Sequence, residues 1–331
     1  MKAIIWTKYG SPDGLKLKEI NKPVPGDMEI LVKVHATTVT AGDYEMRSLK
    51  FPFWLRLPMR LYVGLLRPAR VSIIGQELAG EVESVGRGVT QYKPGDRVFG
   101  ATGFRTGTYA EYVCLPEVPD DAEGVLALMP ANVSYEEAAA VPTGGLEALH
   151  FLRKAAIQPG HKILINGAGG SIGTFGVQLA KLFGAEVTAV DSAGKLDMLR
   201  SIGADHVLDY TKEDFTQNGQ IYDVIFDVIG KSPFLRAIRA LNPGGAFLMA
   251  NPKFSRMILG GLVSKLTGKR VIFEMNKQEK EDLVYLRNLV EEGKLKTVIG
   301  KRYPLEQMAE AHRYVETGAK QGNLVITLNH T

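Results

Sequence analysis

A glycine-rich turn near the middle of the chain carries the residue types with the clearest chemical meaning. The segment runs from Asn166 to Ser192 and reads NGAGGSIGTFGVQLAKLFGAEVTAVDS. A short β-branched run precedes its glycines and apolar residues at helical spacing follow them, so we predict a strand, a turn and a helix. A helix that begins beside Ser171 directs backbone N–H groups and the positive end of its dipole at the turn. This arrangement favours a bound pyrophosphate, and the natural occupant is a dinucleotide.

The glycine pattern departs at one position from the usual dinucleotide fingerprint. The G-x-G-x-x-G pattern is met as Ala168, Gly170 and Gly173, with alanine in the first place. Asp191 ends the next predicted strand about twenty residues later, where an acid that binds a ribose is expected. The alternative is an ordinary glycine turn that binds no ligand. The residues expected to line the phosphates are Ala168, Gly169, Gly170, Ser171, Ile172 and Gly173.

Composition limits the class of protein. The chain has 331 residues, a formal net charge of +4 and one cysteine, Cys114. A single cysteine excludes an intramolecular disulfide and a zinc cluster of thiolates, and the charge is too small to favour nucleic acid. No apolar run reaches the length needed to cross a bilayer, and the amino terminus lacks the apolar region of a secretory signal. We therefore expect a cytoplasmic protein of about two domains.

The pattern of apolar residues and turn signals changes along the chain and indicates two regions. The first 115 residues hold short alternating segments between turn signals, which are typical of a compact β domain. These segments are 2–6, 29–36, 80–85 and 109–115. From Ser134, which forms a predicted capping box with Glu137, helices and strands alternate and predict a parallel sheet. Its expected strands are 162–166, 186–191, 206–208, 223–228 and 246–250, with a turn at 243–245 before the fifth and an edge strand at 270–275. The tail is predicted to hold helices at 279–292 and 306–316 and a strand at 324–328.

This order of a β domain, a dinucleotide unit and a returning tail resembles the medium-chain dehydrogenase/reductase superfamily, in its zinc-free quinone oxidoreductase branch. The segments that carry the resemblance include MKAIIWTKYGSPDGLKLKEI, ILVKVHATTVTAGD, GQELAGEVESVG, YKPGDRVFG, GTYAEYV, NGAGGSIG, ADHVLDY, YDVIFDVIG and LNPGG. The resemblance implies an α/β protein with a GroES-like β-rich catalytic domain and a Rossmann cofactor domain, a doubly wound parallel sheet. We expect the catalytic domain to span 1–125, completed by 285–331, and the Rossmann domain to span 126–284.

The positions that hold catalytic zinc in related alcohol dehydrogenases carry other residues here. The superfamily's cysteine and histidine positions read Thr40, ahead of Asp43, and Gln76, between Gly75 and Glu77. A further expected cysteine position falls among the alanines at 138–140. Because a catalytic zinc needs three nitrogen, sulfur or carboxylate ligands, we predict that this chain binds no metal.

Loss of zinc changes which carbonyl substrates are plausible. A simple ketone needs a strong Lewis acid to accept hydride, whereas a quinone or an α,β-unsaturated carbonyl spreads the developing charge to an oxygen. A few hydrogen-bond donors aimed at that oxygen then suffice, since one donor can contribute roughly 3 to 4 kcal/mol. The resemblance points to Tyr44, Thr40, Gln76 and Arg47 as the candidate catalytic residues. Tyr44 could instead only shape the pocket, and Asp43 is expected to organise neighbouring backbone donors.

The residues predicted around the adenosine ribose include some that are typical of NAD binding and others that are typical of NADPH binding. Asp191 could accept bonds from both ribose hydroxyls, the usual sign of NAD. Ser192, Lys195 and Tyr210 match positions that hold the 2′-phosphate in similar NADPH-dependent reductases. Family precedent favours NADPH and leaves NADH open. The resemblance places two further residues at the cofactor, Thr143 and Asn251.

The segment 47–70 is the most lopsided in charge. It contains five arginines, one lysine and no acid among many apolar residues. One interpretation is a lid over the substrate pocket, with arginine side chains that extend to water. The other is weak peripheral contact with an anionic membrane surface.

Together these observations predict an NAD(P)H-dependent oxidoreductase that transfers hydride to a quinone or enone without a metal, as a homodimer that binds no nucleic acid. An open edge strand is the ground for expecting a dimer. Two alternatives remain. One is an alcohol dehydrogenase that acts without zinc, and the other is a protein that binds dinucleotide without catalysis.

Overall fold

A computed structural model describes residues 1–51, 53–120, 124–251, 254–274 and 276–330. The chain divides into two compact units. Unit 1 comprises Met1–Thr143, Gln278–Glu291 and Thr297–Thr331, and unit 2 comprises Gly144–Lys277 and Glu292–Lys296. The boundaries therefore differ from the predicted 125/126 and 284/285. Residues 126–143 join unit 1 because strand β7 (Val125–Leu128) pairs with β5 (Arg97–Ala101). Helix α3 (Tyr135–Ala139) also packs on strands β3 (Glu29–Thr38) and β4 (Glu77–Val85).

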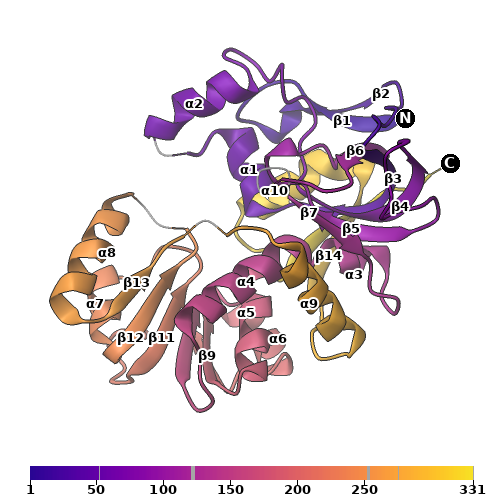
Figure 1. Ribbon diagram of the computed structural model, residues 1–331. Helices are drawn as coiled ribbons and strands as arrows, with labels where there is room; N and C mark the ends of the chain where they lie inside the picture. The colour runs from indigo at the N-terminus through magenta and orange to yellow at the C-terminus, as the bar shows by residue number, and fades with distance from the viewer. Residues whose placement is uncertain (52, 121–123, 252–253, 275, 331) are drawn as a thin grey trace. The chain divides into compact units, whose positions relative to one another are not determined.

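Unit 1 is rich in β-strands, as the alternating segments predict (Figure 1). Within the described residues its strands pair antiparallel except for one parallel pair, β14 (Ile299–Pro304) with β15 (Asn323–Thr327). Strands β1 (Lys2–Trp6) and β2 (Leu15–Glu19) form a hairpin, with the 3-10 turn η1 (Pro12–Gly14) between them. The main sheet runs in the order β14, β15, β3, β4, β5 and β7, and β6 (Tyr112–Pro116) pairs with β3. The other elements of this unit are α1 (Ala41–Ser48), α2 (Phe53–Val63), η2 (Gly103–Arg105), α9 (Lys280–Glu291), η4 (Leu305–Gln307) and α10 (Met308–Glu316).

The returning tail completes the core of unit 1. Strand β15 pairs antiparallel with β3, and the residues of α10 and η4 that face inward join the same buried apolar cluster as Trp6 and Tyr109. Burial of this apolar surface is the main force that closes the unit. The tail therefore supplies part of the core of unit 1.

Unit 2 is a parallel sheet in the strand order β10, β9, β8, β11, β12, β13. The strands are β8 (Lys162–Asn166), β9 (Glu186–Asp191), β10 (His206–Asp209), β11 (Tyr222–Asp227), β12 (Leu241–Met249) and β13 (Arg270–Ile272). Helices α5 (Ser171–Leu182) and α6 (Leu196–Ser201) pack on β8 to β10, and α7 (Phe234–Arg239) and α8 (Phe254–Thr267) pack on β12 and β13 (Figure 1). Helix α4 (Pro142–Ala155) and turn η3 (Ala193–Lys195) complete the elements.

The strand order reverses between β8 and β11, which is the order of a Rossmann sheet. In such sheets a ligand binds outside the carboxyl ends of the strands at the point of reversal. The structure therefore confirms the predicted fold class and directs attention to the residues that follow β8 and β11.

Two predicted features of the unit 2 sheet need correction. The turn expected at 243–245 lies inside β12, where the pairing with β11 shifts register after Tyr222 and Gly244 takes a φ of +75°. A glycine bulge keeps the strand continuous where local turn signals alone predict a break. The edge strand expected at 270–275 ends at Ile272, and Met275 lies outside the described residues.

Candidate functional site

The glycines of the turn after β8 have different structural roles. Gly167 has a φ of +87°, a backbone conformation that glycine adopts without strain. A Cβ on Gly173 would lie 2.4 Å from the carbonyl oxygen of Gly167, so this glycine lets helix α5 pack against the turn. A Cβ on Gly170 would meet nothing nearer than 3.8 Å, so the space beside Gly170 is open.

Gly170 is the N-cap of helix α5, and no side chain caps the helix there. The first turn of a helix has backbone N–H groups without intrahelical partners, and it carries a partial positive charge. An open, uncapped helix start at the carboxyl edge of a Rossmann sheet is suited to a pyrophosphate. The chain thus fits a dinucleotide at Gly169, Gly170, Ser171 and Ile172, with Ala168 buried behind them.

Asp191 braces the same turn from the end of β9. Its Oδ2 accepts a bond from the backbone N–H of Gly169 at 2.8 Å, and its Oδ1 accepts one from the backbone N–H of Ser192 at 2.8 Å. The side chain is nearly buried. Much of its hydrogen-bonding capacity therefore serves the protein itself, which the sequence pattern does not reveal.

Lys195 forms an ion pair with Asp191, although the sequence predicts that the two residues favour different groups at the 2′ position of the ribose. The Nζ of Lys195 lies 3.1 Å from Oδ1 of Asp191, with both side chains largely shielded from water. The Ser192 hydroxyl lies 3.4 Å from the same oxygen. Tyr210 is more than half exposed, and its backbone N–H donates to the carbonyl of Asp191. The predicted ribose residues thus gather at one corner of unit 2.

A second polar cluster sits at the point where the strand order reverses. Asn166, at the end of β8, donates from Nδ2 to Oδ1 of Asp227 at 2.9 Å. Asp227 ends β11, is fully buried, and accepts from the Ser232 hydroxyl and from Arg256 Nη1 at 3.3 Å. Asn251 donates to the carbonyl of Val228 at 2.9 Å. Of these residues only Asn251 is predicted at the cofactor; the polar residues that end strands β8 and β11, Asn166 and Asp227, are a sequence signal that could have indicated the others.

In unit 1, Thr40 and Asp43 form a capping box at the start of α1. The Thr40 hydroxyl donates to Oδ2 of Asp43 at 2.7 Å, and the Thr40 oxygen accepts from the backbone N–H of Asp43 at 3.1 Å. Asp43 is almost fully buried, and its Oδ1 has no hydrogen bond of normal geometry among the described residues. Burial raises the pKa of Asp43 to about 6, against the opposing effect of the bonds from Thr40. Asp43 thus organises the helix start, and Thr40 has its hydroxyl proton committed.

Gln76 and Glu77 lie next to this helix start. The Gln76 side chain is part-buried, and its Nε2 donates to the carbonyl of Gly103 at 3.2 Å. Glu77 is buried, and it accepts bonds from the Thr38 hydroxyl and from the backbone N–H of Thr143, the latter at 2.6 Å. Burial raises the pKa of Glu77, while these two donors oppose the shift. Thr143, expected at the cofactor, therefore also anchors the start of α4.

Tyr44 keeps a hydrogen available on its hydroxyl. The Nζ of Lys50 donates to the Tyr44 hydroxyl oxygen and also lies 4.7 Å from the centre of the ring. A phenol that accepts from an ammonium group still has its own O–H hydrogen to donate. Tyr44 is only part-buried.

Arg47, in contrast, is fully buried and engaged on all sides. Its Nε donates to Nδ1 of His312 at 3.3 Å, and its two other nitrogens donate to the carbonyl of Gly10 and to Glu316. The Nε2 of His312 lies 3.2 Å from the Tyr109 hydroxyl. The structure thus sets Arg47 apart from Tyr44, Thr40 and Gln76 and places it in a structural network.

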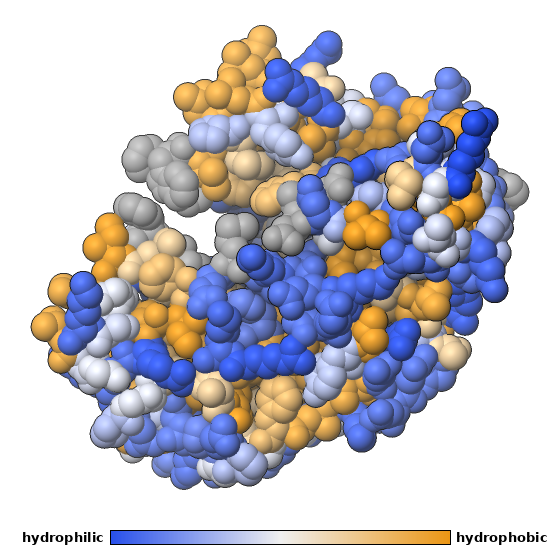
Figure 2. Space-filling view, viewed as in Figure 1, coloured by the Kyte–Doolittle hydropathy of each residue, from blue (hydrophilic) through white to orange (hydrophobic). Residues whose placement is uncertain are grey.

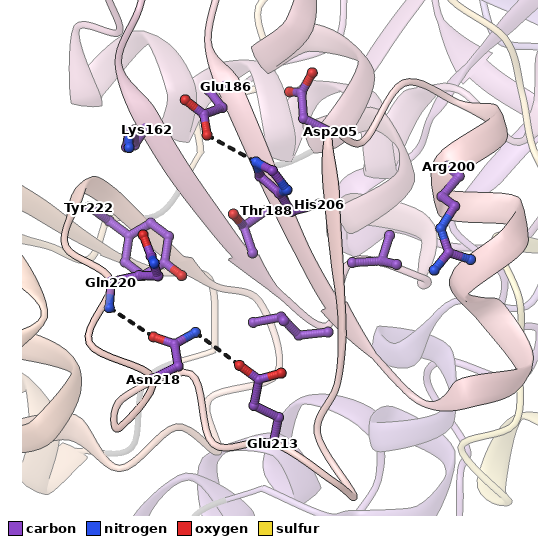
Figure 3. A pocket seen from close by; sticks show the side chains of 12 residues that line it. Lys162, Glu186, Thr188, Arg200, Asp205, His206, Glu213, Asn218, Gln220 and Tyr222 are labelled. Carbon is purple, nitrogen blue, oxygen red and sulfur yellow. Dashed lines mark hydrogen bonds and ion pairs between the residues drawn. The ribbon is translucent and has the colours of Figure 1, made fainter.

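Unit 2 has a hollow of about 460 Å³, and none of the residues that line it belongs to the glycine turn. Figure 3 shows its lining side chains. Its lining includes Lys162, Glu186 and His206, which begin β8, β9 and β10, so it opens at the amino edge of the sheet. His206 Nε2 bonds to Glu186 at 3.0 Å, and Asn218 donates to Glu213, so its polar groups largely satisfy one another. In the described part of the chain, no group of three histidine, cysteine or acidic side chains could hold a metal ion.

Comparison with known proteins agrees with this architecture. A family described as alcohol dehydrogenase GroES-like domain matches residues 26–120, and one described as zinc-binding dehydrogenase matches residues 202–326. The chain is 35% identical to 2-methylene-furan-3-one reductase of Solanum lycopersicum, over 98% of this chain and 79% of that protein. It is 33% identical to the chloroplastic NADPH-dependent alkenal/one oxidoreductase of Arabidopsis thaliana, over the same shares.

Solved structures give the same answer. The quinone oxidoreductase of Coxiella burnetii superposes with a TM-score of 0.85 at 30% identity, over 99% of both chains. The match covers both units, so the likeness is not confined to the dinucleotide turn. The predicted resemblance is confirmed. The chain therefore belongs to the medium-chain dehydrogenase/reductase superfamily, in its quinone oxidoreductase branch.

Proposed function

We propose that this protein is an NAD(P)H-dependent reductase of quinones or α,β-unsaturated carbonyl compounds. The observation that carries the proposal is the open, uncapped start of α5 at Gly170, in a chain whose relatives are named as reductases of such compounds. The helix start supplies a phosphate cradle. The relatives supply the reaction class. Neither an alcohol dehydrogenase nor a binding protein without catalysis is favoured by these names.

The side chains of unit 1 suit an electron-poor carbonyl substrate. The nicotinamide of the cofactor, when bound, supplies hydride. We propose that Tyr44 donates its hydroxyl hydrogen to the substrate oxygen and that the Gln76 amide assists. The contact from Lys50 supports the role of Tyr44, because it orients the hydroxyl and leaves its hydrogen free. Thr40 and Arg47 are assigned positioning roles, since Thr40 donates to Asp43 and Arg47 is buried.

We further propose NADPH as the preferred cofactor. The ion pair with Lys195 offsets the charge of Asp191, which would otherwise repel a 2′-phosphate. Ser192, Lys195 and Tyr210 then supply a hydroxyl, an ammonium group and a phenol to that phosphate. The name of the alkenal/one oxidoreductase, which states NADPH dependence, supports this choice. NADH remains the alternative cofactor.

The absence of zinc, a homodimer and a cytoplasmic location stay proposals. The zinc-ligand positions read Thr40 and Gln76, and this chemistry supports reduction without a metal. Strand β13 forms one edge of the sheet of unit 2, and an open edge is suited to pairing with a second copy. Gel filtration with light scattering measures the number of copies directly.

A substrate screen tests the reaction. The purified protein is mixed with NADPH or NADH and with a quinone, a conjugated enal or a saturated aldehyde, before and after dialysis against a strong chelator. We expect turnover with the quinone or enal, little with the saturated aldehyde, and no loss after chelation. Tight cofactor binding without turnover across the panel would contradict the enzyme assignment. Loss of activity that added zinc restores would contradict reduction without a metal.

A further inference from the structure

One surface of unit 1 combines exposed leucines with exposed arginines. It consists of the second half of α2 and the turn that follows, residues 56–70, and we name it the basic leucine surface. Its exposed leucines include Leu57 and Leu66, with 58% and 88% of their area accessible. The full set is Leu57, Leu61, Leu65 and Leu66, with Arg56, Arg60, Arg67 and Arg70. Pro52 and the side chains of Phe53 and Trp54 lie outside the described residues.

The inner face of α2 explains why these leucines point outward. Val63 is fully buried, and Met59 packs against the apolar core of unit 1. Residues four apart share a helix face, so Leu57 and Leu61 lie together on a face of α2 that turns away from Val63. Arg56 and Arg60 flank them on the same helix. Figure 2 shows hydrophobic and hydrophilic side chains adjoining at the α2 end of the molecule.

Hydrogen bonds from side chains to backbone carbonyl groups fix the conformation of this surface. The Tyr62 hydroxyl donates to the carbonyl of Phe104 at 2.9 Å, and Arg70 Nη1 donates to the carbonyl of Leu61 at 2.9 Å. The Tyr9 hydroxyl donates to the carbonyl of Gly64. The exposed apolar area is therefore presented by an ordered element.

The charge of the surface has one sign. No acid occurs between Arg47 and Gln76 in the sequence. Within the described ranges, no ion pair joins Arg56, Arg60 or Arg67 to an acid. Exposed leucines beside unpaired arginines would be costly to cover with a neutral or basic partner. In a two-fold contact with a second copy, the arginines of each copy would face those of the other.

We propose that the basic leucine surface docks reversibly on an anionic lipid bilayer. The arginines would lie among anionic headgroups, and the leucines would enter the boundary between headgroups and acyl chains. A bilayer satisfies both properties at once, because it presents negative charge above an apolar interior. No helix among the described residues is long and apolar enough to cross a membrane. The contact is therefore peripheral, and it is independent of the proposed reaction.

Vesicle co-sedimentation of the full chain tests the proposal. The probes are phosphatidylcholine vesicles with and without about 30 mol % phosphatidylserine, at about 50 mM and about 500 mM salt. We expect binding to the anionic vesicles at low salt, at least about tenfold weaker binding at high salt, and little binding to neutral vesicles. Absence of binding to anionic vesicles at low salt overturns the proposal, as does equal binding to both vesicle types.

Two paired variants locate the surface. Replacing Arg56 and Arg67 by glutamine should weaken binding to the anionic vesicles by about 30-fold, since each cation near such a surface contributes a factor of about five to the affinity. The matched control replaces the exposed Lys16 and Lys18 of β2 by glutamine and should change binding far less. Equal losses in the variant and the control would assign the effect to net charge and overturn the surface.

A second variant, in which Leu61 and Leu66 are replaced by glutamine, tests the contribution of the leucines to vesicle binding. We expect at least about tenfold weaker binding to the anionic vesicles. The matched control replaces the exposed Val24 and Val118 by glutamine. A changed KM for the quinone with unchanged vesicle binding would identify a substrate lid instead. A smaller particle in light scattering, again with unchanged vesicle binding, would identify a contact between copies. Either result overturns the bilayer as the occupant.

Discussion

Nε of Arg47 lies 3.3 Å from Nδ1 of His312, although 265 positions separate the two residues in the sequence. Because the arginine can only donate, Nδ1 of His312 must be the unprotonated nitrogen of the ring. Nε2 of His312 therefore carries the hydrogen and donates to the Tyr109 hydroxyl at 3.2 Å. Burial, aided by the charge of Arg47, lowers the pKa of His312 to about 3 and keeps the ring neutral. The contact thus fixes the direction of a buried hydrogen-bond chain beneath helix α1.

Replacing His312 by phenylalanine should strongly destabilise unit 1. The change removes a hydrogen-bond acceptor of the buried Arg47 and leaves the Tyr109 hydroxyl without its donor. An unpaired buried polar group costs about 1 to 3 kcal/mol, and a charged group costs more, so we expect a loss of about 3 kcal/mol. Urea unfolding measures this loss. The control is His206→Phe, on an exposed histidine, and equal losses in the two variants would refute the buried network.

Asp43 should make the stability of the wild-type protein depend on pH between about 4 and 6. The pKa of Asp43 is about 6 in the folded protein and 3.8 for an ordinary aspartate exposed to water, so the folded protein binds more protons in this window. Stability therefore falls as pH rises through the window, by about 3 kcal/mol for this group when complete. Asp43→Asn lacks the titration. The free energy of unfolding of the wild type should thus decline relative to Asp43→Asn as pH rises, whereas a constant difference would disprove the shift.

Gly170 and Gly173 should respond differently to substitution. Gly170→Val places a side chain in open space at the start of α5, so the variant should fold and lose cofactor affinity by at least about tenfold. Gly173→Ala drives a methyl group into the carbonyl oxygen of Gly167, so its main defect should be stability. Cofactor titration and thermal unfolding without cofactor separate the two effects. Unchanged cofactor affinity in folded Gly170→Val would contradict the phosphate cradle.

Lys195→Ala should reveal which cofactor the protein prefers. A charge-assisted bond to phosphate contributes about 1.5 to 3 kcal/mol, so we expect NADPH to bind roughly 10- to 150-fold more weakly and NADH to change little. The control is Lys212→Ala, which removes an exposed charge from the same unit. Dissociation constants for both cofactors provide the measurement. Equal weakening of both cofactors in Lys195→Ala would argue against a phosphate-specific role.

Asp191→Asn provides a second test of the cofactor preference. If NADPH is the partner, Asp191→Asn should change NADPH binding little, because the amide oxygen can still accept from the backbone N–H of Gly169 and the negative charge near the 2′-phosphate is removed, although the backbone N–H of Ser192 loses its acceptor. If NADH is the partner, the variant should bind NADH about tenfold or more weakly, since a charged bond to the ribose is lost. The dissociation constants of both cofactors are therefore compared for the Lys195 and Asp191 variants. If each variant changes NADPH and NADH binding equally, neither residue determines the cofactor preference.

The sequence alone determined the features that depend on near neighbours. Strands β8 and β9 have the predicted bounds because a buried parallel strand is a short apolar run, and glycines punctuate it. Helix α5 begins at Ser171 as expected, and the segments of the resemblance identified the family. The helix start that cradles phosphate follows from a handful of adjacent residues, so local pattern was enough.

Tertiary structure decided which polar groups are already engaged. Arg47 looked like an exposed donor in a basic segment, yet the fold buries it against His312 from the far end of the chain. The sequence predicts that Asp191 and Lys195 favour different cofactors at the ribose, yet in the structure they pair with each other, and Asp191 also accepts from the backbone N–H of Gly169. Burial and pairing arise from contacts between distant segments, and the charge and hydrogen-bonding capacity left for a ligand depend on those contacts. No local pattern of residue types contains that information.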